Sequence, residues 1–166
     1  MLANSSYRPR RDPWLTTMTT YTITRPATAP KNEGIAREWA LCAHYMVNRT
    51  SHDSLAYDKG SDLDANGKHI SIKASAFTLM AGCLCEGLTS FDDIWNLYAE
   101  RVHSDTFAYV TADFTVYEMN LAEFKRFVYA FAHTERESEK NGGQVKIRLR
   151  KESGKMLKWL ANMVTA

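Results

Sequence analysis

The hydrophobic and polar positions of the chain predict amphipathic helices that alternate with short strands. The first helix is predicted over about Glu33 to Val47, where apolar residues recur at helical spacing. Its predicted buried stripe consists of Ile35, Trp39, Cys42 and Met46. A helix therefore opens the part of the chain in which the pattern is regular.

Further elements follow at regular intervals. They are a strand over Lys68–Lys73, a helix over Phe91–His103, strands over Thr106–Thr111 and Phe114–Met119, a helix from Asn120 to about Glu137, a strand over Gln144–Arg150, and a short helix carrying Met156, Leu157, Trp159 and Leu160. Ser90 with Asp93, and Asn120 with Glu123, have the spacing of capping boxes at two helix starts. This order predicts an α/β domain in which helices flank a central mixed sheet.

The first 30 residues differ from the rest in composition. They are rich in Thr, Ser, Arg and Pro, although Thr16 to Thr24 could form one strand. We therefore expect a flexible or partly ordered arm over residues 1–30 and a single domain over residues 31–166.

Bulk composition excludes some classes of protein. The 166 residues are 45% hydrophobic but include no apolar run long enough to cross a bilayer. The N-terminus lacks the apolar stretch of a secretory signal, and the three cysteines are an odd number with no zinc-site spacing. We expect a cytoplasmic protein with reduced thiols and no membrane partner.

Charge is informative through its distribution rather than its sum. The formal net charge is only +2, yet both ends of the chain are basic and the middle is acidic. Between Lys140 and Lys158 the only acid is Glu152. Such a segment either contacts nucleic-acid phosphates or forms an ordinary solvated surface.

The segment from Tyr57 to Ser75 carries the candidate chemistry. It contains an acid, Asp62, then the tight-turn signal Asn66-Gly67, then a strand that ends in Ile-Lys-Ala-Ser. Strand alternation places Ser71 and Lys73 on one face. A helix, an acid, a hairpin and a lysine thus follow one another in a short stretch.

This arrangement resembles the core hairpin of the PD-(D/E)xK nucleases, a superfamily that includes many type II restriction enzymes and phage nucleases. In that family an Asp on one strand is followed on the next strand by an acid-x-Lys element. Asp62 matches the acid and Lys73 the lysine, whereas Ser71 stands where the family has Glu or Asp. The resemblance covers about residues 33–75 and implies a restriction-endonuclease-like α/β fold.

The resemblance also implies metal-dependent hydrolysis of DNA phosphodiester bonds. Mg²⁺, or Mn²⁺ in its place, activates a water molecule and neutralises charge on the phosphate. Asp62 is the expected central ligand, helped by the main-chain carbonyl of Ile72. Lys73 is expected to orient or deprotonate the attacking water, or to stabilise the transition state.

Because Ser71 is a poor Mg²⁺ ligand, a carboxylate must come from elsewhere for the site to work. Glu38 lies roughly 60° from the predicted buried stripe of its helix, so it is the first candidate. Asp58 and Asp64 are alternatives. A third alternative is that the fold persists without catalysis.

Double-stranded DNA is the expected partner. The residues expected to contact its backbone are Ser75, Lys146, Arg148, Arg150 and Lys151. A restriction-type enzyme that cuts palindromic sites implies a homodimer, although the chain shows no dimer seam.

Other interpretations remain open at this stage. Asp58, Asp62 and Asp64 are also typical loop formers, and Lys73 would then be an exposed strand residue. A catalytically silent DNA-binding protein of the same fold would bind with steep salt dependence and need no metal. A protein-interaction or inhibitor module would ignore DNA and use its aromatic residues at an interface.

Overall fold

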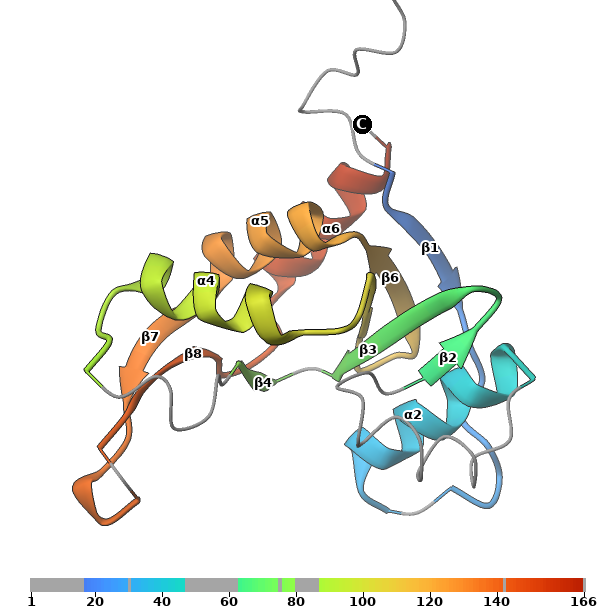
Figure 1. Ribbon diagram of the computed structural model, residues 1–166. Helices are drawn as coiled ribbons and strands as arrows, with labels where there is room; N and C mark the ends of the chain where they lie inside the picture. The colour runs from blue at the N-terminus through green and yellow to red at the C-terminus, as the bar shows by residue number, and fades with distance from the viewer. Residues whose placement is uncertain are drawn as a thin grey trace, which may run out of the picture.

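A mixed five-stranded sheet forms the centre of the fold in the computed structural model of the chain (Figure 1). The structure describes residues 17–29, 31–46, 63–74, 76–79, 87–141 and 143–165. In spatial order the strands are β1 (Thr19–Thr22), β6 (Thr115–Met119), β5 (Thr106–Val110), β3 (Lys68–Ala74) and β2 (Leu63–Ala65). Strands β3 and β5 are parallel, and the other neighbours are antiparallel.

A second, antiparallel sheet of three strands lies beside the first. Its order is β4 (Phe77–Leu79), β8 (Val145–Leu149) and β7 (His133–Arg136), with a short 3-10 turn over Glu139–Asn141 between β7 and β8. Strand β8 confirms the predicted alternation, because Val145, Ile147 and Leu149 are buried. The strands β4 and β7 were not predicted from the sequence.

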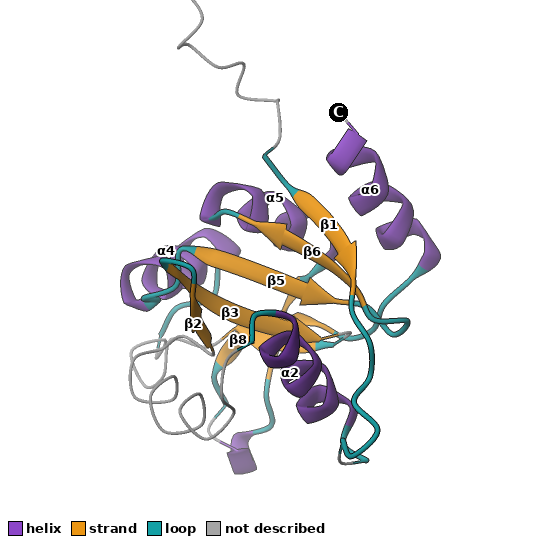
Figure 2. Cartoon of the chain, turned by 90° about the vertical axis from the view of Figure 1, so that its right-hand side faces the viewer, coloured by secondary structure: helices purple, strands orange, loops and turns teal. Residues whose placement is uncertain are grey.

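Within the described ranges, four α-helices flank the sheets: α2 (Glu33–His44), α4 (Phe91–Arg101), α5 (Leu121–Phe131) and α6 (Gly154–Thr165). Helix α2 covers one face of the five-stranded sheet, and α4 and α5 cover the other (Figure 2). Ser90 accepts a hydrogen bond from the Asp93 amide at 3.1 Å, and Asn120 and Glu123 form the complete capping box. The helices on both faces confirm the predicted α/β class.

Helix α5 ends earlier than its sequence suggests. The helix was predicted to continue to about Glu137, but it stops at Phe131, and residues 133–136 pair with β8. Residues such as Glu135 and Arg136 have good helix propensity. Pairing with β8 outweighs this preference, because it satisfies the backbone groups of a segment that would otherwise extend away from the core.

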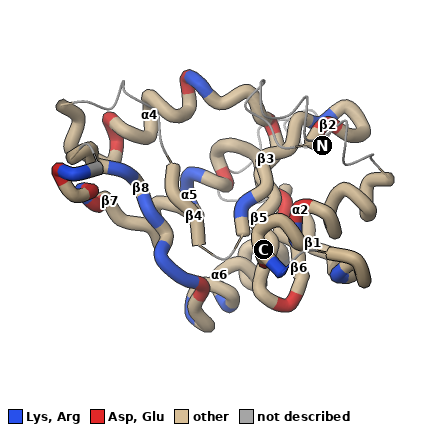
Figure 3. The backbone as a smooth tube through the Cα atoms, turned by 90° about the horizontal axis from the view of Figure 1, so that it is seen from below, with Lys and Arg blue, Asp and Glu red and all other residues tan. Residues whose placement is uncertain are grey.

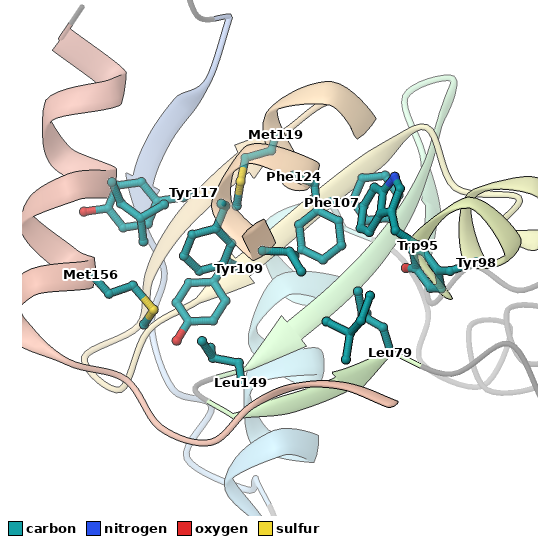
Figure 4. Close-up of a cluster of buried hydrophobic side chains, with 14 of the residues drawn as sticks. Leu79, Trp95, Tyr98, Phe107, Tyr109, Tyr117, Met119, Phe124, Leu149 and Met156 are labelled. Carbon is teal, nitrogen blue, oxygen red and sulfur yellow. The ribbon is translucent and has the colours of Figure 1, made fainter. Parts of the chain in front are cut away.

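Two hydrophobic clusters occupy the two faces of the large sheet. The cluster between α2 and the sheet is formed by Leu41 and Cys42 of the helix and by residues of the strands, which are Leu63, Ile70, Ile72, Ala108, Val110 and Val116. The other face is rich in aromatic side chains, and Figure 4 shows several of them packed together. Phe107 stacks on Phe124 of α5 with ring centroids 4.5 Å apart. The larger cluster therefore fixes α4, α5 and α6 against β5 and β6.

The buried side of α2 differs from the predicted stripe. Ile35 is 42% exposed and Met46 92% exposed, whereas Ala36, Ala40 and Leu41 are fully or almost fully buried. The prediction followed the large apolar residues, but the helix turns its small residues toward the sheet. Alanine at the contact lets the helix axis approach the strands closely.

This close approach predicts a stability difference between two alanines of α2. Replacing the buried Ala40 by leucine should destabilise the fold by about 1–3 kcal/mol, because the added atoms have no space against the sheet. The same replacement at the exposed Ala43 should cost less than about 0.5 kcal/mol. Urea denaturation of both variants measures the difference. Equal midpoints would show that Ala40 is packed less tightly against the sheet than its burial indicates.

Strand β1 joins the N-terminal segment to the domain. Its four residues pair with β6 in an antiparallel register, with Thr19 opposite Glu118 and Thr22 opposite Thr115. The strand that the sequence allowed within Thr16–Thr24 is therefore present as Thr19–Thr22, and the sheet includes residues of the segment that was expected to form an arm. Residues 1–16 lie outside the described part. Within the described residues, no helix combines the length and apolar character needed to span a bilayer.

Candidate active site

The hairpin between β2 and β3 has the geometry that its Asn-Gly sequence predicts. Asn66 and Gly67 both have positive φ angles, 51° and 76°, and Ala65 pairs with Lys68 across the turn. Two consecutive residues in this region are typical of the tight hairpin turn that favours Asn-Gly. Asp58 and Asp62 precede β2 and lie outside the described residues.

Lys73 lies on the face of β3 that turns toward the aromatic cluster. In the parallel register Ser71 is opposite Phe107 and Lys73 is opposite Tyr109, and both aromatic partners belong to that cluster. Ser71 is 4% exposed, so it has little surface for a metal or a substrate. Ser71, which was predicted to be part of the catalytic element, is thus a buried residue of β3. Lys73 is only half-buried, near the end of the strand.

Glu38 belongs to helix α2, which covers the other face of the sheet. Its helix packs on the face of Ile70 and Ile72, which strand alternation separates from the face of Lys73. The neighbouring Arg37 donates from Nε to the carbonyl of Thr111 at 3.1 Å, at the carboxyl end of β5. A site that contains both Glu38 and Lys73 must therefore lie at the carboxyl ends of the strands, where residues from both faces can meet, and not on one face of the sheet.

Ile72 has a buried side chain on the α2 side, 7% exposed. Only its main-chain carbonyl therefore remains as a candidate metal ligand. Among the described residues no three His, Cys, Asp or Glu side chains gather closely enough to hold a metal ion. The predicted Mg²⁺ site thus depends on Asp62 together with residues at this edge.

Glu152 is an acid at this edge that the sequence analysis did not select. One of its oxygens, Oε1, accepts the Ala112 amide at 3.1 Å and the Tyr109 hydroxyl at 3.4 Å. Because β3 and β5 are parallel, their carboxyl ends meet here. Glu152 is therefore next to Tyr109, the register partner of Lys73. Its only signal in the sequence was that it is the single acid in a basic segment.

The Tyr109 side chain brings a hydroxyl to the edge of the core. The residue is fully buried, and its hydroxyl points out of the aromatic cluster on the side of Leu149 (Figure 4). Burial raises the pKa of Tyr109, and the charge and hydrogen bond of Glu152 raise it further. The hydroxyl therefore stays protonated and donates to Glu152. A half-buried lysine, a tyrosine and a carboxylate thus share one end of the sheet.

The basic residues of β8 are engaged by acids of the adjacent segment. Lys146 pairs with Glu137 at 2.5 Å, Arg148 approaches Glu135 at 3.8 Å, and Arg150 donates from Nε to Glu135 at 3.0 Å. Lys146, Arg148, Glu135 and Glu137 line a polar hollow of about 270 Å³. The predicted phosphate contacts of all three cations would have to replace existing ion pairs. Ser75 lies outside the described residues.

A second polar cluster lies under α2. The hydroxyls of Tyr21 and Tyr45 both donate to the carboxylate of Glu118, and Lys68 Nζ lies 3.1 Å from it. The Glu118 side chain is 5% exposed. Burial would raise the pKa of Glu118, but the hydrogen bonds from the tyrosines and Lys68 outweigh it and lower the pKa. This carboxylate, which sequence reasoning missed, links β1, α2, β3 and β6.

Comparison with known proteins identifies no relative. No protein-family model matches the chain, and neither the curated proteins nor the solved structures include a match. The functional interpretation therefore depends on the site alone.

Proposed function

We propose that this protein hydrolyses DNA phosphodiester bonds in a metal-dependent reaction at the carboxyl ends of β3 and β5. The observation that carries the proposal is the position of Lys73. It follows a tight hairpin, lies half-buried near a strand end, and has Tyr109 as its register partner. A lysine in this position is accessible to a substrate and held by a rigid strand.

The fold supports the proposal in two ways. Helix α2 precedes the β2–β3 hairpin, and the hairpin belongs to a mixed sheet covered by helices on both faces. Both features agree with a restriction-endonuclease-like domain, which is the fold that we propose. The buried Cys42 retains its thiol, which agrees with a cytoplasmic location.

We assign a distinct role to each residue in the proposed reaction. Asp62, Glu38 and the carbonyl of Ile72 would hold Mg²⁺ or Mn²⁺, since hard cations prefer oxygen ligands. The bound ion would supply a water of lowered pKa and offset charge on the phosphate. Lys73 would orient that water and stabilise negative charge as it develops. Glu152, fixed by Tyr109, would help to position the lysine.

The substrate that we propose is double-stranded DNA, and a homodimer follows if both strands of a palindromic site are cut. The test is to incubate the protein with DNA and RNA duplexes of one sequence while titrating Mg²⁺, Mn²⁺ or a chelator. We expect cleavage of DNA that requires the metal. Absence of cleavage with either metal would remove the hydrolytic proposal, and equal cleavage of RNA would broaden the substrate class.

One observation favours a second function. Ser71 replaces the family's acid and is buried, and the described residues alone do not complete a metal site. A DNA-binding protein without catalysis would show both features. It would bind DNA equally in the presence of metal and of chelator, and no fragment would appear in the titration above.

A further inference from the structure

The cations that would hold a nucleic-acid backbone can be divided by their partners. Lys146 and Arg148 of β8 and Arg150 just after it, which we call the β8 cations, are paired within the protein, because they contact Glu135 or Glu137. The two carboxylates offset two of these three charges. Glu135 also accepts from His133 at 3.1 Å. A phosphate that binds these cations must compete with carboxylates that already offset most of their charge, so it is attracted less strongly than it would be by unpaired cations.

The basic segment continues beyond β8 toward the start of α6 (Figure 3). It carries Lys151, Lys155 and Lys158, which we call the α6 lysines. All three are exposed, and none makes an ion pair with any residue that the structure describes. Lys155 and Lys158 are three residues apart on α6 and therefore lie on one side of the helix, away from the buried Met156 and Leu160.

Glu152 places the α6 lysines next to the candidate site. Its carboxylate is fixed to the Ala112 amide and the Tyr109 hydroxyl at the carboxyl end of β5. Lys151 precedes Glu152 in the chain, so its backbone lies at the end of the sheet where Lys73 is located. Helix α6 starts two residues after Glu152. A phosphate backbone that reaches Lys73 would pass close to the start of α6.

We propose that the α6 lysines bind the DNA backbone and position it at Lys73, while the β8 cations do not bind DNA. The proposal rests on the proposed function for the identity of the polyanion. The proposal changes the set of residues expected to contact DNA. Lys151 is retained, and Lys155 and Lys158 are added. The residues removed from the set are Lys146, Arg148 and Arg150.

Two variants with equal loss of charge test the proposal. In one, Lys151, Lys155 and Lys158 are replaced by glutamine; in the other, Lys146, Arg148 and Arg150 are. Binding to a fluorescent DNA duplex is measured in EDTA, where no cleavage occurs, at several salt concentrations. Circular dichroism confirms that both variants are folded.

We expect the α6 variant to reduce the slope of log affinity against log salt by two to three, since each phosphate contact contributes about 0.9. That slope corresponds to a loss of affinity on the order of 100-fold at about 0.1 M salt. The β8 variant should change the affinity by less than about threefold, because its cations are already paired with carboxylates of the protein.

Equal losses in the two variants, or a larger loss in the β8 variant, would overturn the proposal. Because binding is measured without metal, the outcome is independent of cleavage. If the wild type cuts DNA but the α6 variant binds DNA normally, only the assignment of DNA binding to the α6 lysines is wrong. Salt-sensitive binding through the α6 lysines without cutting would remove only the hydrolytic function. If the α6 variant binds DNA normally but no longer binds anionic lipid vesicles that the wild type binds, the α6 lysines bind a membrane surface instead of DNA.

Discussion

Replacing Lys73 by alanine is expected to reduce metal-dependent DNA cleavage by about 10²–10⁴-fold, the usual contribution of a positioned proton-transfer group. The side chain lies half-buried near the end of β3, opposite Tyr109, so alanine removes the ammonium group without disturbing the pairing with β5. DNA affinity should change by less than about threefold, since a single positive charge is lost from a larger interface.

Single-turnover cleavage with enzyme in excess measures this effect on the chemical step. Lys125→Ala is the matched control, because it removes one exposed lysine on α5 and should leave the rate unchanged. Asp62→Ala should reduce cleavage as strongly as Lys73→Ala if the carboxylate is the central metal ligand. A Lys73→Ala protein that cleaves at the wild-type rate would place the active site elsewhere on the molecule.

Replacing Glu118 by glutamine is expected to lower the free energy of unfolding by about 3 kcal/mol. The change removes the charge of a buried carboxylate and leaves the donors Tyr21, Tyr45 and the partly exposed Lys68 around an uncharged amide. The melting temperature should fall by roughly 6–12 °C. Tyr21→Phe removes one donor and should cost about 1 kcal/mol. A Glu118→Gln protein as stable as the wild type would mean that the cluster contributes little to the docking of α2.

The same carboxylate predicts a pH dependence. Because the pKa of Glu118 is lower in the folded protein than in the unfolded chain, its stabilisation is present above the unfolded pKa of about 4.3. It is lost as the pH falls further, through the folded pKa. Between about pH 5 and pH 3 the wild type should therefore lose stability more steeply than Glu118→Gln. Parallel curves of the two proteins in urea denaturation would contradict this assignment.

Local signals predicted most of the fold. The Asn66-Gly67 turn, the alternation of β3 and β8, and the capping residues of α4 and α5 each act within a few residues, and the structure confirms them. Strands β4 and β7 lacked such signals. Their three or four residues become strands because β8 supplies partners on both sides. The buried face of α2 was predicted only in part. Cys42 is buried as expected, but Ala36 and Ala40 were missed, because hydrophobicity marks large residues and close packing selected small ones.

The candidate site was predicted only where its parts are close in sequence. The face and the strand of Lys73 followed from the hairpin. The burial of Ser71 did not, because it results from the packing of Phe107 and its neighbours on that face. Glu152 is 79 residues from Lys73 in the chain, and only the parallel pairing of β3 with β5 brings the two to one edge. No local pattern contains that information.

The most direct test of the proposed activity is incubation of the purified protein with supercoiled plasmid in Mg²⁺, with a parallel sample in EDTA. We predict nicked and linear DNA in Mg²⁺, none in EDTA, and none with a Lys73→Ala protein purified in the same way. Intact plasmid in both Mg²⁺ and Mn²⁺, or equal cutting by wild type and Lys73→Ala, would contradict a nuclease site at Lys73.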